Sequence, residues 1–335
     1  MPSIVERSLA QWVNDFAVLY EEPDDTRAPE HMWLAAMAHF SSVGEAIRQY
    51  NFLEIYRTSA HAFCWICSFI NKLRTTNELV FRIDEEPWKL VGFKYPRCCG
   101  HCCEARCACI QKERETQLNK VFKYNEWLRK LKQMERIGPK WSIRQWMQMS
   151  REIYGAKTDL RPLDSIGFHL LEEGGEEAKA IRTLTQFRGV CDNSMSGVSE
   201  GFLRDICTLK TLVNFHRKLT EEVLKYSRCS TELEMRKKKL PLSSDKSPVV
   251  LKWKIVSAKL EMVAELCDTF SWFCTVLLKC GDIAEKLGLK DKEKAKWNIE
   301  ECIGEIYKSK GPDVPLRCYA CAKSRCECTN FAKLY

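Results

Sequence analysis

The amino-acid sequence predicts an all-α protein, because its composition supplies a core but few chain breaks. Of its 335 residues, 45% are hydrophobic and 10% aromatic, which is enough to build a substantial core. Only 15 glycines and 11 prolines accompany 29% charged residues. Long segments without turn signals favour helices over a many-stranded β fold. We therefore expect helical bundles with apolar residues at helical spacing.

Four landmarks occur in the same order in each half of the chain, which predicts an internal repeat. They are a helix opening with Gln-Trp, a Gly-Glu helix, an aromatic helix and a cluster of four cysteines. The aromatic segments 61–70 and 268–277 align without a gap. The cysteines have identical spacing in the two clusters, which consist of Cys99, Cys102, Cys107 and Cys109, and of Cys318, Cys321, Cys326 and Cys328.

The landmarks divide the chain into two expected helical repeats, 1–111 and 141–335. The charged, amphipathic segment 112–140 is predicted to be a connecting helix. The second repeat carries an insertion at about 184–257, which has helical periodicity and then the basic run Arg236–Lys239. We expect the two repeats to pair within the chain, and a further homodimer is equally compatible.

Each cysteine cluster is expected to bind one structural zinc ion, in the loops 99–109 and 318–328. Four thiolates fill a tetrahedral shell and leave no position for a substrate. Cys98, His101 and Cys103 crowd the first loop and could exchange with its assigned ligands. Reduced cysteines without metal, or an iron–sulfur cluster, are the alternatives.

The N-terminal sequence lacks a basic region followed by an apolar one, so we expect no secretory signal and a cytoplasmic protein. Clustered cysteines in such a chain indicate metal binding more often than disulfides. The most apolar stretches are too short or too interrupted by charge to span a bilayer, so no membrane segment is expected.

Two helices of the second repeat each carry a stripe of carboxylates, because residues three or four positions apart share a helical face. The stripes are Glu172, Glu173 and Glu176 on the first helix, and Glu261, Glu265 and Asp268 on the second. Facing each other, they would form an all-oxygen site for a hard cation such as Mg²⁺. The alternative is a pair of solvated helix faces, since glutamate favours helices generally.

The segments 168–184 and 259–278, "FHLLEEGGEEAKAIRTL" and "KLEMVAELCDTFSWFCTVLL", resemble the MazG-like nucleotide pyrophosphohydrolases. That family has Glu-x-x-Glu on one helix and Glu-x-x-Asp on a later one, usually with a shorter separation than here. The resemblance implies two helical bundles in tandem that hydrolyse nucleoside triphosphates, NTP or dNTP, to monophosphate and pyrophosphate with Mg²⁺ or Mn²⁺. It assigns metal binding to Glu173, Glu176, Glu265 and Asp268, and leaves Glu172 and Glu261 as flanking acids.

Either flanking acid, Glu172 or Glu261, could orient or deprotonate the attacking water. Basic residues beside the stripes could contact phosphates or be ordinary solvated helix charges; they are Lys179, Arg182, Lys259 and Lys279.

The first repeat is expected to keep the fold and to lose the site. Aligning the repeats places Ser42 opposite Glu173, Thr58 opposite Glu265 and His61 opposite Asp268, whereas Glu45 and Glu54 match Glu176 and Glu261. Hydroxyl groups cannot offset the charge of Mg²⁺. The alternative is an active first repeat around a softer metal, with His39, Glu45, Glu54 and His61 as ligands.

The alternative function belongs to a different class: a zinc-stabilised nucleic-acid-binding module, or a catalytically inactive nucleotide-sensing module. The net charge of +8 could attract nucleic acid, but the 53 basic residues are interspersed with 45 acidic ones. Nucleic acid is therefore a compatible partner that the sequence does not favour.

Overall fold

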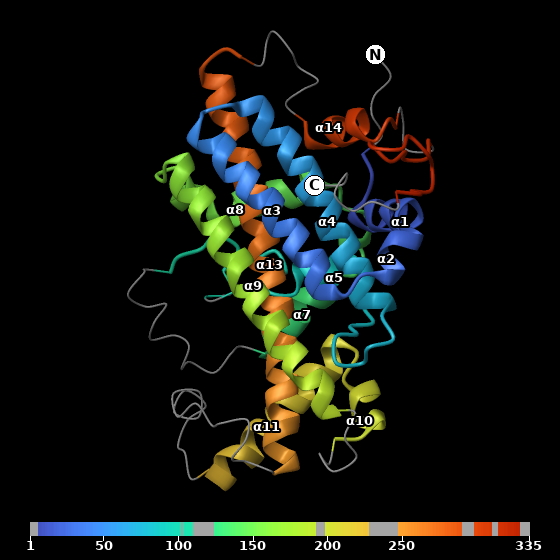
Figure 1. Cartoon of the computed structure of the whole chain (residues 1–335). Coiled ribbons are helices and arrows are strands. Elements are labelled where there is room, and N and C mark those ends of the chain that lie inside the picture. Colours follow the sequence, from blue (N-terminus) through green and yellow to red (C-terminus); the bar gives the residue numbers. More distant parts are fainter. Residues whose placement is uncertain are drawn as a thin grey trace.

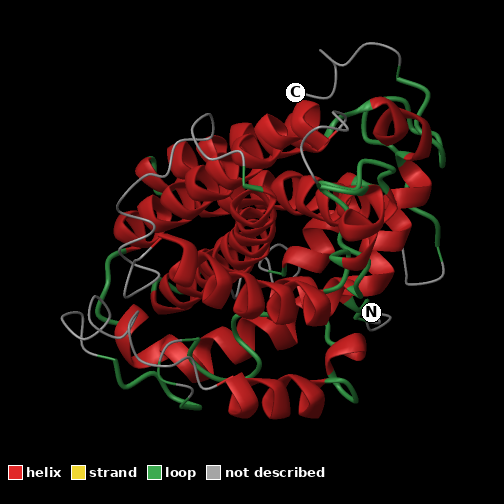
Figure 2. Ribbon diagram, turned by 90° about the horizontal axis from the view of Figure 1, so that it is seen from below, coloured by secondary structure: helices red, strands yellow, loops and turns green. Residues whose placement is uncertain are grey.

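The computed structural model describes residues 6–100, 102, 104–109, 124–191, 198–227, 247–289, 298–309 and 314–328. These residues form helices and loops without a β-strand, and Ser8 and Ser142 form an isolated antiparallel bridge (Figure 2). The prediction of an all-α fold is confirmed for this part of the chain. No helix in it is both long enough and apolar enough to cross a membrane.

The first half contains five described helices, which are α1 (Leu9–Leu19), α2 (Glu21–Thr26), α3 (Pro29–Arg48), α4 (Phe52–Thr75) and α5 (Pro87–Gly92). The remaining described elements are α7 (Tyr124–Met134), the short 3₁₀ helix η1 (Gly138–Lys140), α8 (Ile143–Thr158), α9 (Leu163–Cys191), α10 (Glu200–Asp205), α11 (Leu209–Ser227), α13 (Pro248–Lys286) and α14 (Ile299–Ile306). Figure 1 shows α13, the longest at 39 residues, running through the molecule with α9 alongside it.

The two Gln-Trp helices, α1 and α8, begin in the same way. Ser8 and Ser142 are their N-cap residues, and each forms a reciprocal capping box with the glutamine three positions later. Such a cap satisfies backbone N–H groups that the first helical turn leaves without partners. The repeated Ser-x-x-Gln pattern therefore fixes two equivalent helix starts.

The two halves share one hydrophobic core. Helix α3 packs along α4, α9 packs along α13, and α3 and α9 also pack against each other. Phe63 of α4 stacks on Phe273 of α13 with ring centroids 6.1 Å apart, and both rings are fully buried. Trp33 donates a hydrogen bond of 2.9 Å to the Gly174 carbonyl oxygen. Burying each large apolar side chain contributes about 1.5–3 kcal/mol, so the interface between the halves is a major source of stability.

The helices of the predicted insertion, α10 (Glu200–Asp205) and α11 (Leu209–Ser227), lie around the N-terminal end of α13 (Figure 1). Residues 200–227 of the insertion form α10 and α11, as their periodicity indicated, and the insertion also includes the end of α9 and the start of α13. Helix α11 packs on the N-terminal part of α13, where Trp253 donates a 3.0 Å hydrogen bond to Thr220. The basic run Arg236–Lys239 and residues 112–123 of the expected connecting segment lie outside the described residues.

Each cysteine loop packs against the other half of the chain. The Cys107 amide donates to the Ile153 carbonyl oxygen at 2.8 Å, and the Cys326 amide donates to that of Leu19 at 2.7 Å. Ile153 and Leu19 occupy equivalent landmark positions. The helices before the loops are exchanged in the same way, since α5 packs on α13 and α14 packs on α4. The first cysteine loop is thereby placed beside the acidic helices of the second half.

Candidate functional site

A pocket of about 330 Å³ opens where α8, α9 and α13 meet the segment after α5. Its acidic lining consists of Glu172, Glu173, Glu176, Glu265 and Asp268. The other lining residues are Lys94, Tyr95, Tyr154, Lys157, Thr158, Arg161, His169, Ser271, Trp272 and Thr275. Five of the six predicted acids therefore border one cavity.

Three of these carboxylates converge. Glu173 and Glu176 on α9 and Glu265 on α13 each offer an oxygen within 4.8 Å of the others, and such a group could hold a metal ion. Burial, together with the charge of Asp268, raises the pKa of Glu173 to about 7 and that of Glu265 to about 8, although the charge of Lys94 acts in the opposite direction on both. Crowded acids of this kind need a cation or protons to offset their repulsion.

The fourth predicted metal ligand, Asp268, is engaged by a neighbouring segment. Its carboxylate forms an ion pair with the Lys94 ammonium group and accepts a hydrogen bond from the Tyr95 hydroxyl. The charges of Glu265 and Glu173 also favour the protonated form of Lys94. Lys94 thus supplies a positive charge at the edge of the acidic group.

Lys94 and Tyr95 are functional candidates that the sequence did not reveal. They lie in the first half, between α5 and Cys99, and reach Asp268 only because the cysteine loops are exchanged. Their closeness to the cysteine cluster was the one signal in the sequence that set them apart.

The two flanking acids differ in position. Glu172 is 62% exposed at the rim of the pocket, and its Oε2 atom lies 3.1 Å from the Nδ1 atom of His169. Glu261 is not among the lining residues, and its charge acts on the wholly buried Glu177. Burial raises the pKa of Glu177 well above its ordinary value, and the charges of Glu265 and Glu261 add to this effect. Glu177 was not singled out in the sequence.

Of the four predicted phosphate-binding residues, none lines the pocket. Lys259 is fully buried, and its ammonium group donates to the carbonyl oxygens of Leu79 at 3.0 Å and Arg82 at 2.8 Å. The expectation that Lys259 faces phosphate is corrected: helix packing gives its charge a structural role. Lys179 and Arg182 are exposed on α9 outside the pocket.

Lys279 also has a structural role, which the repeat makes clear. Its ammonium group donates to the carbonyl oxygens of Thr158 at 3.3 Å and Asp159 at 2.9 Å. The equivalent Lys72 donates to those of Asp24 at 2.9 Å and Asp25 at 3.2 Å. A contact made in both halves, including the half without the acids, does not depend on the pocket. A phosphate contact for Lys279 stays a prediction from the sequence.

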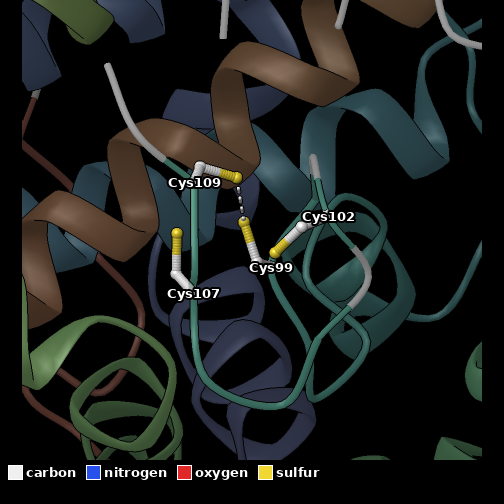
Figure 3. A group of neighbouring side chains, drawn as sticks. All are labelled: Cys99, Cys102, Cys107 and Cys109. Carbon is white, nitrogen blue, oxygen red and sulfur yellow. Dashed lines mark hydrogen bonds between the residues drawn. The ribbon is translucent and has the colours of Figure 1, made fainter. Parts of the chain in front are cut away.

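The two cysteine clusters form compact groups of sulfur atoms that could hold a metal such as zinc. The four Sγ atoms of each cluster lie within 4.8 Å of one another, and the Sγ atoms of Cys99 and Cys109 are 3.9 Å apart (Figure 3). Cys318 and Cys328 repeat this distance of 3.9 Å. Zinc–sulfur bonds of about 2.3 Å in a tetrahedron place sulfur atoms about 3.8 Å apart.

Hydrogen bonding favours the thiolate form of one cysteine in each cluster, Cys107 and Cys321, whereas burial and neighbouring cysteines raise the pKa of Cys109 and Cys326. Although burial favours the neutral thiol of Cys107, the Cys109 backbone and the Lys157 ammonium group lower its pKa to about 7. Burial likewise opposes ionisation of Cys321, but backbone hydrogen bonds from Lys323 and Glu327 lower its pKa to about 7. Two of the neighbours considered in the sequence, His101 and Cys103, lie outside the described residues.

The first cluster touches the pocket through α8. The Lys157 ammonium group lies 3.2 Å from the Cys107 Sγ atom and also donates to the Cys109 carbonyl oxygen. The Tyr154 hydroxyl donates to the Cys99 Sγ atom at 3.7 Å. Both Tyr154 and Lys157 line the pocket, so the pocket wall and the first cluster share side chains.

The first half does not rebuild the acidic group. His39 and His61 stack with ring centroids 5.4 Å apart, and burial lowers the pKa of His61 to about 4. Glu45 is exposed and bonded to Arg48 at 2.5 Å and to Gln49 at 2.6 Å. Among the described residues, no group of three possible metal ligands forms around His39, Glu45, Glu54 and His61.

Raised carboxyl pKa values predict that the metal-free protein loses stability as the pH rises. Groups whose folded pKa is raised stabilise the fold below the unfolded value near 4.5, and that stability is lost as the pH passes the folded values of about 7 for Glu173 and about 8 for Glu265. We expect the melting temperature in EDTA to fall between pH 6 and pH 8.5, by roughly 2–4 °C for each kcal/mol lost. Thermal unfolding followed by circular dichroism measures this.

Asp24 and Glu300, outside the pocket, also have pKa values raised by burial, to about 6 and about 7, so they too lower the melting temperature as the pH rises. The Glu265→Gln variant separates the contribution of Glu265 from theirs. It should keep their contribution and that of Glu173 and lose that of Glu265, so its melting temperature should depend less on pH. A wild-type melting temperature that rises from pH 6 to pH 8.5 would contradict the prediction.

The fold and site define an all-helical protein with a carboxylate-lined pocket and two clusters of four cysteines. Comparison of the chain with protein-family models, with curated proteins and with solved structures gave no match.

Proposed function

We propose that this chain is a Mg²⁺-dependent nucleoside triphosphate pyrophosphohydrolase with one site, in the second half. The observation that carries the proposal is the convergence of Glu173, Glu176 and Glu265 within one pocket. The resemblance of the two acidic helices to MazG-like enzymes supports the same assignment. An all-oxygen ligand set suits Mg²⁺ or Mn²⁺, which bridges to phosphate groups.

The proposed reaction is attack of water on the α-phosphorus atom. The bond between the α-phosphorus and its bridging oxygen breaks, pyrophosphate leaves, and the water proton passes to a carboxylate. When bound, Mg²⁺ would neutralise phosphate charge and make the attacking water more acidic. Glu172 borders the pocket and is proposed to orient this water. Glu261 does not line the pocket, so we propose no catalytic role for it.

Asp268 and Lys94 are proposed to act together. In the structure the Lys94 ammonium group pairs with Asp268. A substrate that brings phosphate groups and a metal ion would offer both side chains new partners, the metal for the carboxylate and a phosphate for the lysine. Tyr95 would continue to donate its hydroxyl to Asp268 and hold it in place.

We propose that each cysteine cluster holds a structural zinc ion, because its four sulfurs leave no open ligand position. Cytoplasmic location and the homodimer stay predictions from the sequence.

One observation favours a second candidate, the catalytically inactive nucleotide-sensing module. Lys94 already neutralises Asp268, and a pocket with one acid permanently paired could bind a nucleotide without hydrolysing it. The two candidates differ in whether the bound nucleotide is cleaved.

The test is an assay of the purified full chain with each common NTP and dNTP in the presence of Mg²⁺. We expect equal amounts of pyrophosphate and nucleoside monophosphate from at least one nucleotide, and loss of both products in EDTA. Binding without product would favour the sensing module. Neither binding nor product with any nucleotide would refute both candidates.

A further inference from the structure

Two equivalent arginines lie over equivalent tryptophans in the two halves. The Arg27 guanidinium lies 4.8 Å from the ring centre of Trp65, and the Arg161 guanidinium lies 5.6 Å from that of Trp272. The Gln-Trp helices align these arginines, and the aromatic helices align these tryptophans. The halves therefore present the same cation on the same support, and any difference between the two arginines reflects their surroundings.

In the first half the arginine is neutralised by its own chain. The Arg27 guanidinium forms a 2.9 Å ion pair with Asp24, and the side chains are 7% and 6% exposed. The cavity there is small, at about 10 Å³, and Tyr307 and Tyr319 from the end of the chain help to line it. The Arg27 side chain is thus enclosed by protein atoms, and the cavity beside it is too small for a ligand.

In the second half the acidic partner is missing. The position equivalent to Asp24 is Thr158, whose hydroxyl donates to the carbonyl oxygens of Tyr154 at 3.3 Å and Gly155 at 3.2 Å in its own helix. The Nη1 atom of Arg161 is buried and has no hydrogen-bond partner among the described residues. A buried guanidinium N–H without a partner is unfavourable unless a ligand satisfies it.

The other two cations of the pocket are already engaged. Lys94 pairs with Asp268, and Lys157 bonds to Cys107 and Cys109. Arg161 is therefore the lining cation with an unused hydrogen-bond donor in the described part of the pocket. A guanidinium presents planar paired donors that match the oxygens of a phosphate group.

We propose that Arg161 is an anion-binding residue that contacts a phosphate group of a nucleoside triphosphate in the pocket. Trp272 supports the guanidinium plane and is a positioning residue for it. This inference rests on the proposed function for its ligand, since the acidic group would bind the metal ion and Arg161 would bind a phosphate. The partner that Asp24 supplies in the first half is supplied by the ligand in the second.

The test compares Arg161→Gln, which removes the cation, with Thr158→Asp, which rebuilds the ion pair of the first half. Thr158→Asn is the matched neutral control, and Arg144→Gln removes an exposed charge elsewhere on α8. Binding is measured by calorimetry with Mg²⁺, using α,β-methylene ATP and inorganic tripolyphosphate as separate ligands. Circular dichroism and thermal unfolding show whether each variant is folded.

We expect the Kd for both ligands to rise on the order of tenfold or more in Arg161→Gln and Thr158→Asp, and to change less than twofold in Arg144→Gln. Thr158 lines the pocket, so Thr158→Asn reports the effect of the larger side chain alone and should raise the Kd clearly less than Thr158→Asp does. If Arg161→Gln does not fold, Thr158→Asp decides, because the same pair exists in the folded first half. An unchanged Kd in both test variants, a change for the nucleotide alone, or no saturable wild-type binding would overturn the proposal.

The outcome is separable from that of the proposed function. Arg161-dependent binding without pyrophosphate release would refute the hydrolase and keep the anion site. Pyrophosphate release with the same Kd in the wild type, Arg161→Gln and Thr158→Asp would do the reverse.

Discussion

The Glu265→Gln variant should lose pyrophosphate release, with kcat/KM lower by on the order of 10³-fold. Glu265 is the carboxylate that α13 contributes to the acidic group, opposite Glu173 and Glu176 on α9. A neutral amide of the same shape keeps the packing but removes a charge that would hold the proposed metal ion. Because burial raises the pKa of Glu265 to about 8, its neutral form is already compatible with the fold. We therefore expect an intact protein with a disabled site.

Two matched substitutions test whether position, and not acidity alone, decides the effect. Glu45→Gln changes the first-half counterpart of Glu176. Glu45 is exposed and forms an ion pair with Arg48. Glu261→Gln changes a carboxylate that lies one helical turn from Glu265. Glu261 does not line the pocket. Each should change kcat/KM less than about threefold, since surface and non-lining charges contribute little. Loss of activity in Glu45→Gln equal to that in Glu265→Gln would show that the first half takes part in the chemistry.

Replacing one cysteine of the first cluster should reduce the activity of the pocket, whereas the equivalent replacement in the second cluster should not. Cys99→Ser and Cys318→Ser are equivalent changes, and each should lower the zinc content by about one ion per chain. The first cluster is joined to the pocket through Lys94, Tyr95 and the side chains of Tyr154 and Lys157. We expect Cys99→Ser to reduce pyrophosphate release roughly 10- to 100-fold, as loss of an outer support of a metal site does.

Cys318→Ser provides the internal control for that experiment. The second cluster packs against α1 and against His61 of the first half, where Tyr319 lies 5.0 Å from the histidine ring centre. Its loss should destabilise that end of the molecule and leave the pocket largely unchanged. Elemental analysis, circular dichroism and the pyrophosphate assay are compared on the same samples. Equal loss of activity in the two variants while both stay folded would refute the specific link between the first cluster and the pocket.

Helix content followed from local sequence, and the N-cap residues start α1 and α8 two residues before the Gln-Trp pairs with which these helices were expected to open. The Ser-x-x-Gln caps at Ser8 and Ser142 begin α1 and α8, and the apolar periodicity of residues 200–227 marks α10 and α11. These features act between residues within one or two turns, so the sequence carries them directly. The spacing of the cysteines is equally local, and the two groups of sulfur atoms formed as expected.

The acidic stripes were only partly resolved by sequence reasoning. Helical spacing put Glu261, Glu265 and Asp268 on one face of the helix, but residues that share a helical face need not all border the same pocket. The packing of α9 on α13 brings Glu265 to Glu173 and Glu176, whereas Glu261 is outside both this group and the lining of the pocket. Which residues of a stripe meet depends on how the two helices pack, and the sequence of one helix does not specify this.

By itself, the sequence determined an all-helical chain with a repeated order of landmarks, two cysteine clusters and two acidic helices. Only the tertiary structure decided that Lys94 and Tyr95 reach Asp268, that Arg161 lines the pocket with its Nη1 atom lacking a hydrogen-bond partner among the described residues, and that Lys259 is buried. The contacts of Lys94, Tyr95 and Lys259 join segments far apart in the chain, and those of Lys94 and Tyr95 accompany the packing of the first cysteine loop on the opposite half. Local patterns specify helices and ligand spacing, whereas the exchange follows from burying the apolar faces of both halves in one shared core.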